Sequence, residues 1–331
     1  PRIKVMSRLD IAQKGLPQDG RSMVLIAGRK IDIRVSTIPT VHGEKIVMRL
    51  LFQEEKLMQL RQLGLAKYIL QPYQNLINSS GGIILVTGPT GSGKTTTLYA
   101  SLAEIDNEAR NIITIEDPVE YKLSGYSQIE VKPKVGLTFA NALRSVLRQD
   151  PDVIMVGEMR DTETAQIAIQ SALTGHLVFS TVHTNSAPAT ITRLIDMGIE
   201  PFLVSSSIIG VLAQRLVRRI CPDCRKSYQP HPEQLRELGI KEVSFRKLDR
   251  RFFRGDGCDN CRQTGYRGRI GIHELLVMSE GVKNTILESS DSDTIKKQGL
   301  KEKMITLRRD GVNKILHGLT TAEEILTITS E

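Results

Sequence analysis

The sequence contains no tryptophan, and only seven phenylalanines and seven tyrosines occur among its 331 residues. Proteins that bind single-stranded nucleic acid usually stack the bases on several aromatic side chains, so a nucleic-acid partner is disfavoured. Long hydrophobic runs are lacking as well. The longest, such as residues 83–86 and 153–156, have the length of a strand, whereas a membrane span needs roughly 20 apolar residues.

The first residues carry no secretion signal, because Arg2, Lys4 and Arg8 interrupt the apolar positions. We therefore expect a protein of the cytoplasm. Since residue 1 is not methionine, we also expect the chain to be a fragment of a longer protein.

Cysteine is scarce, but its four copies form a pattern. They make two C-x₂-C pairs separated by 33 residues, at Cys221, Cys224, Cys258 and Cys261. This spacing is typical of a tetrahedral Zn²⁺ site with four thiolate ligands and no open position, so we predict a structural zinc. Disulfides are the alternative, which a reducing compartment disfavours.

Positive charge is concentrated around these cysteines. The chain has a net charge of +8, and residues 215–269 alone carry 15 Lys and Arg against 7 Asp and Glu. Such a surface can bind anionic lipid headgroups or an acidic protein. An ordinary solvated surface is the alternative, and nucleic acid is the least favoured partner.

Hydrophobic periodicity divides the chain into parts. Residues 1–60 predict three antiparallel strands, at 21–26, 31–38 and 45–50, beside a helix near 6–14. From residue 65, strand-length runs (83–87, 112–115, 153–156, 177–181) alternate with helix-length segments (94–109, 139–148, 162–173). This alternation predicts an α/β fold with a mostly parallel sheet.

A helical tail is expected after residue 272. Helix starts are predicted at Ser290-Asp291 and at Thr320, the latter with Glu323 as a capping box. We therefore expect four parts: 1–60, 65–220, the zinc module 221–272 and the tail 273–331.

The segment after the first of the predicted parallel strands fits the phosphate-loop pattern G-x-x-x-x-G-K-[ST]. Glycines let the backbone N–H groups turn toward phosphate oxygens, Lys94 reaches the β- and γ-phosphates, and Thr95 binds Mg²⁺. The residues expected to bind the nucleotide are Gly88, Pro89, Thr90, Gly91, Ser92, Gly93, Lys94, Thr95 and Thr96.

Polar residues follow three of the predicted strands, where side chains of a parallel sheet converge on the ligand. We assign Glu116 to orienting the attacking water and Glu158 to the Mg²⁺ shell, and the reverse assignment is the alternative. His183 is predicted to sense phosphate, with an ordinary structural histidine as the alternative. His176 has weaker support, and Asp161 is expected to cap a helix.

Residues 88–95, 115–120, 156–161 and 174–183 resemble the Walker A, Asp box, Walker B and His box of the secretion ATPases. These enzymes use ATP to drive type II secretion and type IV pilus assembly. The run 202–218 is more similar to the type II branch. A type IV pilus assembly ATPase is the alternative, and a nucleic-acid translocase is a more distant one.

The resemblance implies a RecA-like ATPase core, a PAS-like N-terminal domain and a homohexameric ring. It also implies partners in the secretion machine, namely the inner-membrane platform and its cytoplasmic-domain proteins, and a location on the cytoplasmic face of the inner membrane. Members of the type II branch usually carry a further N-terminal domain that docks on the membrane complex. Its absence here supports the expectation of a fragment.

Strand alternation places Arg34 and Arg49 on the face opposite the apolar residues of their strands. The resemblance implies that arginines at these positions contact the nucleotide. Solvated strand arginines are the alternative, and Arg144, Arg148 and Arg160 are competing donors.

Overall fold

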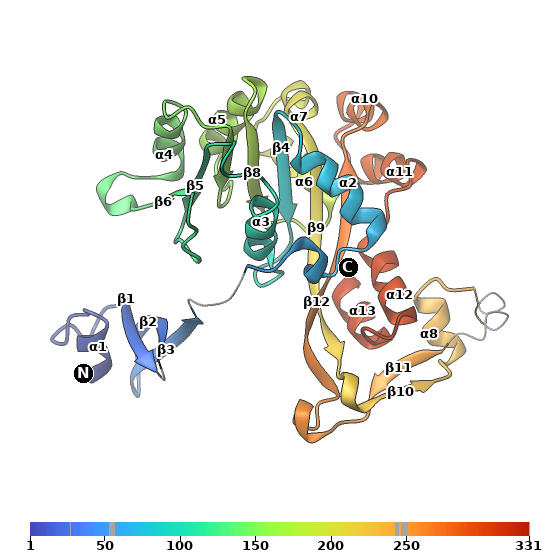
Figure 1. Cartoon of the computed structure of the whole chain (residues 1–331), viewed down its shortest axis with the longest axis horizontal. Helices are drawn as coiled ribbons and strands as arrows, with labels where there is room; N and C mark the ends of the chain where they lie inside the picture. Colours follow the sequence, from blue (N-terminus) through green and yellow to red (C-terminus); the bar gives the residue numbers. More distant parts are fainter. Residues whose placement is uncertain (27, 53–56, 242–244, 246–250, 331) are drawn as a thin grey trace. The chain divides into compact units, whose positions relative to one another are not determined.

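The computed structural model describes residues 1–26, 28–52, 57–241, 245 and 251–330. The chain forms two compact units, Pro1–Leu57 and Met58–Glu331 (Figure 1). None of the helices in the described ranges is both long enough and apolar enough to cross a membrane.

The N-terminal unit is a three-stranded antiparallel sheet in the order β1-β2-β3, preceded by a short helix. Its elements are α1 (Arg2–Met6), β1 (Gln18–Ile26), β2 (Arg29–Thr40) and β3 (Gly43–Phe52). The three predicted strands are confirmed. Gly28, with φ 79°, supplies the left-handed turn between β1 and β2.

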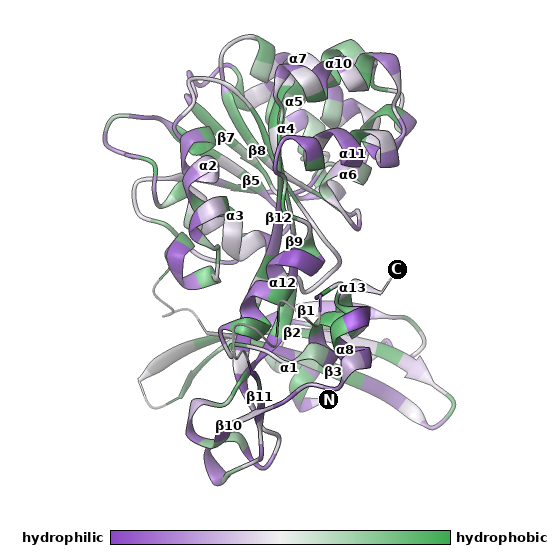
Figure 2. Ribbon diagram, turned by 90° about the vertical axis from the view of Figure 1, so that its right-hand side faces the viewer, coloured by the Kyte–Doolittle hydropathy of each residue, from purple (hydrophilic) through white to green (hydrophobic). Residues whose placement is uncertain are grey.

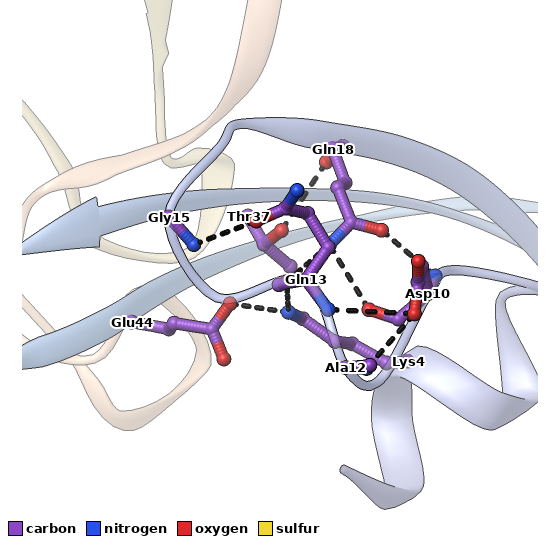
Figure 3. A network of polar contacts seen from close by, with 8 residues as sticks. All are labelled: Lys4, Asp10, Ala12, Gln13, Gly15, Gln18, Thr37 and Glu44. Atoms are coloured by element: carbon purple, nitrogen blue, oxygen red, sulfur yellow. Dashed lines mark hydrogen bonds and ion pairs between the residues drawn. The ribbon is translucent and has the colours of Figure 1, made fainter.

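The helix predicted near residues 6–14 is wrong, because the helix ends at Met6. Beyond it, the Asp10 carboxylate accepts hydrogen bonds from the N–H groups of Ala12 (2.8 Å) and Gln13 (3.4 Å) (Figure 3). Such local side-chain bonds compete with helical ones. The buried Lys4 amine holds this loop in place by donating to the Gln13 carbonyl (2.7 Å) and pairing with Glu44 of β3.

The second unit is built on a seven-stranded sheet in the order β12-β9-β4-β8-β7-β5-β6. Six strands are parallel and β12 is antiparallel to β9, so the predicted mostly parallel sheet is confirmed. The strands are β4 (Gly82–Thr87), β5 (Ile112–Glu116), β6 (Ser127–Glu130), β7 (Val153–Val156), β8 (Leu177–Val182), β9 (Ile208–Ile220) and β12 (Tyr266–Val277).

Helices cover both faces of this sheet, and its strands are mainly hydrophobic (Figure 2). Alternate residues of β4 enter two separate cores. On one side lie η1 (Leu60–Leu63), α2 (Lys67–Ile77) and α3 (Lys94–Leu102). On the other lie α4 (Phe139–Val146), α5 (Thr162–Leu173), α6 (Ala187–Asp196) and α7 (Pro201–Ser207). Between β6 and α4 lies η2 (Pro133–Val135).

The helix expected to reach residue 109 ends at Leu102. The residues that follow form turns, in one of which the Asp106 carboxylate accepts from the Glu108 N–H (3.0 Å). Asp161 caps α5 as expected, accepting from the Thr164 N–H (2.8 Å).

The cysteine-rich segment forms η3 (Pro222–Cys224), β10 (Arg225–Tyr228), α8 (Pro232–Glu237), β11 (Phe252–Gly255) and η4 (Asp259–Cys261). The tail is helical, as predicted, with α10 (Glu280–Glu288), α11 (Ser292–Lys301), α12 (Leu307–Leu316) and α13 (Ala322–Thr329).

The helix start at Asp291 is confirmed, but the capping box at Thr320 is wrong by one position. Thr321 caps α13 by accepting from the Glu324 N–H (3.4 Å). The Thr320 hydroxyl instead donates to the Arg218 carbonyl (2.8 Å), and Glu324 pairs with the Arg218 guanidinium. Both side chains of the expected box therefore have long-range partners, because Glu323 accepts a hydrogen bond from Gln234 Nε2 (3.0 Å).

Candidate functional site

The loop between β4 and α3 has the backbone of a phosphate cradle. Gly88, Gly91 and Gly93 have φ values of 150°, 78° and 88°, which residues with a side chain rarely adopt. Gly93 is the N-cap of α3, and Thr95 and Thr96 lie half-buried in its first turn. The N-terminus of a helix at this point favours bound anions.

The Lys94 amine lies inside this loop. It donates to the carbonyls of Gly88 (2.8 Å) and Pro89 (3.2 Å), and the side chain is 9% exposed. Burial lowers the pKa of Lys94, while the nearby Glu158 carboxylate acts in the opposite direction. The amine is therefore a donor placed where phosphate oxygens would enter the loop.

Glu158 follows β7 and lies close to cationic groups. Its carboxylate pairs with Arg160 (2.5 Å) and lies 3.7 Å from Nε2 of His183, which follows β8. Burial lowers the pKa of His183, and the Lys94 charge lowers it further against the opposing effect of Glu158. The structure thus brings Lys94, Glu158 and His183 together from three separate segments.

Glu116, at the end of β5, is 3% exposed, and both of its carboxylate oxygens are engaged. It accepts hydrogen bonds from Thr114 Oγ1 (2.6 Å), Gln128 Nε2 (3.1 Å) and the Tyr99 hydroxyl. Tyr99 lies on α3, one turn after Thr95. The carboxylate therefore ties the helix that begins at the loop to β5 and β6.

Two carboxylates that sequence reasoning did not assign follow Glu116 and are exposed, Asp117 and Glu120. They belong to the same 115–120 motif. Their place in this motif could have identified them as candidates. The sequence does not, however, reveal which carboxylates of the motif become buried.

Other candidate residues have partners of their own. His176 Nδ1 lies 2.8 Å from the Ser171 carbonyl, at the end of α5. Arg144 pairs with Glu163 (2.6 Å), and Arg148 donates to the Arg144 carbonyl (3.0 Å).

Arg34 and Arg49 belong to the N-terminal unit, opposite each other on β2 and β3. Arg21 on β1 is opposite Arg34 on its other side, so the three form one row across the sheet. Sequence reasoning missed Arg21, although the alternation in β1 was visible. The row places three positive side chains on one face of the sheet.

The four cysteines gather at one point, with sulfur atoms all within 4.8 Å of one another. Sγ–Sγ distances are 3.8 Å (Cys221–Cys258), 3.9 Å (Cys224–Cys261) and 3.7 Å (Cys258–Cys261). A metal with bonds of about 2.3 Å to four tetrahedral thiolates gives edges of about 3.8 Å. The N–H groups of Cys258 and Gly265 donate to the Cys261 sulfur at 3.2 Å, which favours a thiolate. No disulfide is formed, and the geometry fits a metal.

Comparison with known proteins extends over nearly the whole chain. The model of a family described as "Type II/IV secretion system protein" matches residues 1–327. "Type II secretion system protein E" of Dickeya dadantii is 52% identical over 330 residues. "Type II secretion system ATPase E" of Vibrio cholerae is 50% identical over 330 residues. Each alignment covers 100% of this chain but only 65% of the relative.

A solved structure has a similar fold. The crystal structure of the pilus retraction motor PilT with bound ADP gives a TM-score of 0.69 at 29% identity. The match covers 96% of this chain and 78% of that one. The α/β fold is thus shared in outline with a pilus motor. In this chain the fold comprises a mixed sheet, a tetracysteine cluster and C-terminal helices.

Proposed function

The chain belongs to the type II/IV secretion system protein family, and from this we propose that it hydrolyses ATP to power type II secretion. In this role it drives pseudopilus assembly and protein export. The observation that carries the proposal is the meeting of Lys94, Glu158 and His183 beside a glycine-rich loop at the start of a helix. The chain spans 65% of the length of the relatives named above.

We propose that residues Gly88 to Thr96 bind the phosphates of ATP and that Lys94 neutralises the β- and γ-phosphates. Thr95 and Glu158 would hold Mg²⁺, which supplies charge neutralisation at the reacting phosphate when bound. His183, whose pKa is lowered by burial and by the Lys94 charge, is placed to hydrogen-bond the γ-phosphate.

We propose that a carboxylate of the 115–120 motif orients the attacking water. Glu116 can reach water only if Tyr99 or Thr114 releases its carboxylate. Glu120 is exposed and needs no such release, so it is the second candidate. The exchange of roles between Glu116 and Glu158 is a third arrangement.

Cationic assistance is proposed to come from Arg34 and Arg49 in a homohexameric ring, with Arg144, Arg148 and Arg160 as competing donors. An arginine that stabilises charge on the transferred phosphoryl group can accelerate such reactions by about 10³–10⁵. Specific activity should therefore rise with protein concentration as rings form. Activity per chain that stays constant in a monomer across dilution would refute the ring requirement.

We further propose that residues 65–220 form a RecA-like core, that 1–60 form a PAS-like domain, and that 273–331 form a C-terminal domain. Residues 221–272 form the zinc module. Cys221, Cys224, Cys258 and Cys261 would hold one Zn²⁺ with a purely structural role, because four thiolates leave no position for water.

The proposed location is the cytoplasmic face of the inner membrane, with the membrane platform and cytoplasmic-domain proteins of the secretion machine as partners. Exposed arginines of the cysteine-rich segment, such as Arg251 and Arg262, offer a contact for anionic lipid. Other basic positions expected there, Arg246, Lys247 and Arg250, lie outside the described residues.

The proposed function is tested by Mg²⁺-dependent ATP hydrolysis of the purified chain, with Lys94→Ala as the inactive control. Addition of DNA or RNA separates a secretion ATPase from a translocase, since strong stimulation by nucleic acid would favour the latter. Complementation of a secretion-deficient and a pilus-deficient strain separates the two branches of the family. Lack of ATP hydrolysis under conditions in which rings are present would contradict the proposal.

A further inference from the structure

Gln214 is a buried amide of the run 202–218 and lies outside the Walker A, Asp box, Walker B and His box motifs. It lies on β9 and is 2% exposed. Its neighbour Ala213 is paired with Thr87, the last residue of β4, so Gln214 stands one step farther along, level with the start of the phosphate loop. The register of the sheet therefore brings a strand from outside the motif up against the loop.

Both ends of the Gln214 amide are used. Nε2 donates to the carbonyl of Ser92 in the loop (2.7 Å), and Oε1 accepts from the Thr97 hydroxyl on α3 (2.6 Å). Thr97 is fully buried, so its hydroxyl cannot turn to solvent instead. One side chain thus connects the loop to the helix that follows it.

Two glycines of the loop, Gly88 and Gly93, pack against Gln214. A Cβ on Gly88 would lie 2.3 Å from the Gln214 carbonyl oxygen, and a Cβ on Gly93 would lie 2.8 Å from Gln214 Nε2. The backbone contact excludes a side chain at Gly88, whereas a side chain at Gly93 would have to displace the Gln214 amide. Gln214 is therefore the surface on which the beginning and the end of the loop pack.

The bond to Ser92 has a consequence for the backbone. In a planar trans peptide the C=O and the following N–H point in opposite directions. Because the Ser92 carbonyl points at Gln214, the N–H of Gly93 points away from β9. If the Ser92 carbonyl turned away from Gln214, the Gly93 N–H would turn toward β9. The concave side of the loop would then lose a hydrogen-bond donor.

We propose that Gln214 is a positioning residue for nucleotide binding, which fixes the Ser92–Gly93 peptide so that its N–H faces the phosphates. This inference rests on the proposed function and adds to it a residue outside the four family motifs. It predicts that losing the amide weakens nucleotide binding even where the chain stays folded.

The test is equilibrium binding of a fluorescent ATP analogue in the presence of Mg²⁺, with thermal unfolding measured on the same samples. Gln214→Met keeps the size of the side chain but removes both hydrogen bonds, and it should weaken binding by about 10- to 100-fold. Thr97→Val removes only the bond that orients the amide and should have a smaller effect. Val217→Ala, at a buried position farther along β9, is the control for a loss of stability alone.

Gln214→Glu gives a readout that a purely structural role would not move. A buried carboxyl titrates above its ordinary range. While protonated, it can still donate to Ser92 and accept from Thr97, whereas the ionised form repels the Ser92 carbonyl. Its affinity relative to the wild-type chain should therefore be near normal at pH 6 and fall as the pH rises toward 9.

The positioning role alone would be overturned if Gln214→Met bound the nucleotide as tightly as the wild-type chain. It would also be overturned if the affinity of Gln214→Glu equalled that of the wild-type chain at every pH. A wild-type chain that binds no nucleotide would instead contradict the proposed function, and the positioning role with it.

Discussion

Arg34 on β2 lies directly opposite Arg49 on β3. Like charges in facing positions of a sheet destabilise it, by roughly the 0.2–1 kcal/mol that opposite charges contribute. Nε of Arg34 is also buried without a hydrogen-bond partner among the described residues. A bound anion would relieve both effects, which supports the proposed contact with phosphate.

Arg49→Ala should therefore change stability and activity in opposite directions. It relieves the repulsion on Arg34, so the N-terminal unit should melt at a slightly higher temperature at low salt. Turnover should fall by about tenfold or more, because the transition state loses cationic help. Calorimetry and ATPase assays measure the two quantities. Lys45→Ala, on the same strand and face but opposite Ile38, is the matched control and should change neither.

Removal of the Glu116 carboxylate should reduce both stability and turnover. In Glu116→Ala the donors on Tyr99, Thr114 and Gln128 lose their acceptor, and each such loss destabilises by about 1–3 kcal/mol. Glu120→Gln, at an exposed position, should lower turnover without changing the free energy of unfolding. Denaturant titration and steady-state kinetics separate the two. If Glu120→Gln retains full turnover while Glu116→Gln loses it at unchanged stability, Glu116 is the residue that orients the water.

The titration of His183 should report on its neighbours. Burial is the main cause of its lowered pKa, and Lys94 lowers it further while Glu158 raises it. Lys94→Ala should therefore raise the pKa of His183, and Glu158→Gln should lower it. NMR of the chain labelled at histidine Cε1 follows both shifts, with the exposed His231 as an internal control. A His183 pKa that stays constant in both variants would mean that these groups do not interact.

Acid should destabilise the second unit through His273. This imidazole is fully buried, and neither of its nitrogens has a hydrogen-bond partner among the described residues. Burial, followed by the charge of Lys314, places its pKa well below 6.5. As the pH falls below about 6.5, the unfolded state binds a proton that the folded state cannot. The free energy of unfolding should then fall by up to about 1.4 kcal/mol per pH unit from this group.

His273→Leu should reduce that acid sensitivity, since the titrating group is gone. Denaturant unfolding at pH 5 to 7 measures the slope, and His231→Leu at an exposed position is the control. An unchanged slope in His273→Leu would assign the acid sensitivity to other groups.

Loss of one thiolate should release the metal and unfold only part of the second unit. Cys258→Ser should lower bound zinc from one per chain to near zero in elemental analysis. Hydrogen exchange should then accelerate at β10 and β11. Strands β4, β5, β7 and β8 should keep their protection, because one of the two cores they enter contains no residue of the cysteine-rich segment. A wild-type chain that carries no zinc after purification without chelators would contradict the metal assignment.

The amino-acid sequence determined the local features of this protein. Hydrophobic runs in the range 83–182 predicted β4, β5, β7 and β8, because strands buried on both faces need continuous apolar residues. The phosphate loop and the paired cysteines could be recognised in the sequence, because each motif consists of residues that lie close together along the chain. Alternation predicted that Arg34 and Arg49 each lie opposite the apolar residues of their own strand. The cross-strand register adds that the two arginines share one face of the sheet.

Tertiary structure decided what each candidate side chain can do. Sequence position treated Glu116 and Glu158 alike, but Tyr99, Thr114 and Gln128 surround only Glu116. The sequence also gave Gln214 no individual role within the run 202–218, because its contact with the loop arises from the register of β9 against β4. The physical reason is that burial and hydrogen-bond partners come from segments distant in sequence, whereas motifs and periodicity report only on residues close together in the chain.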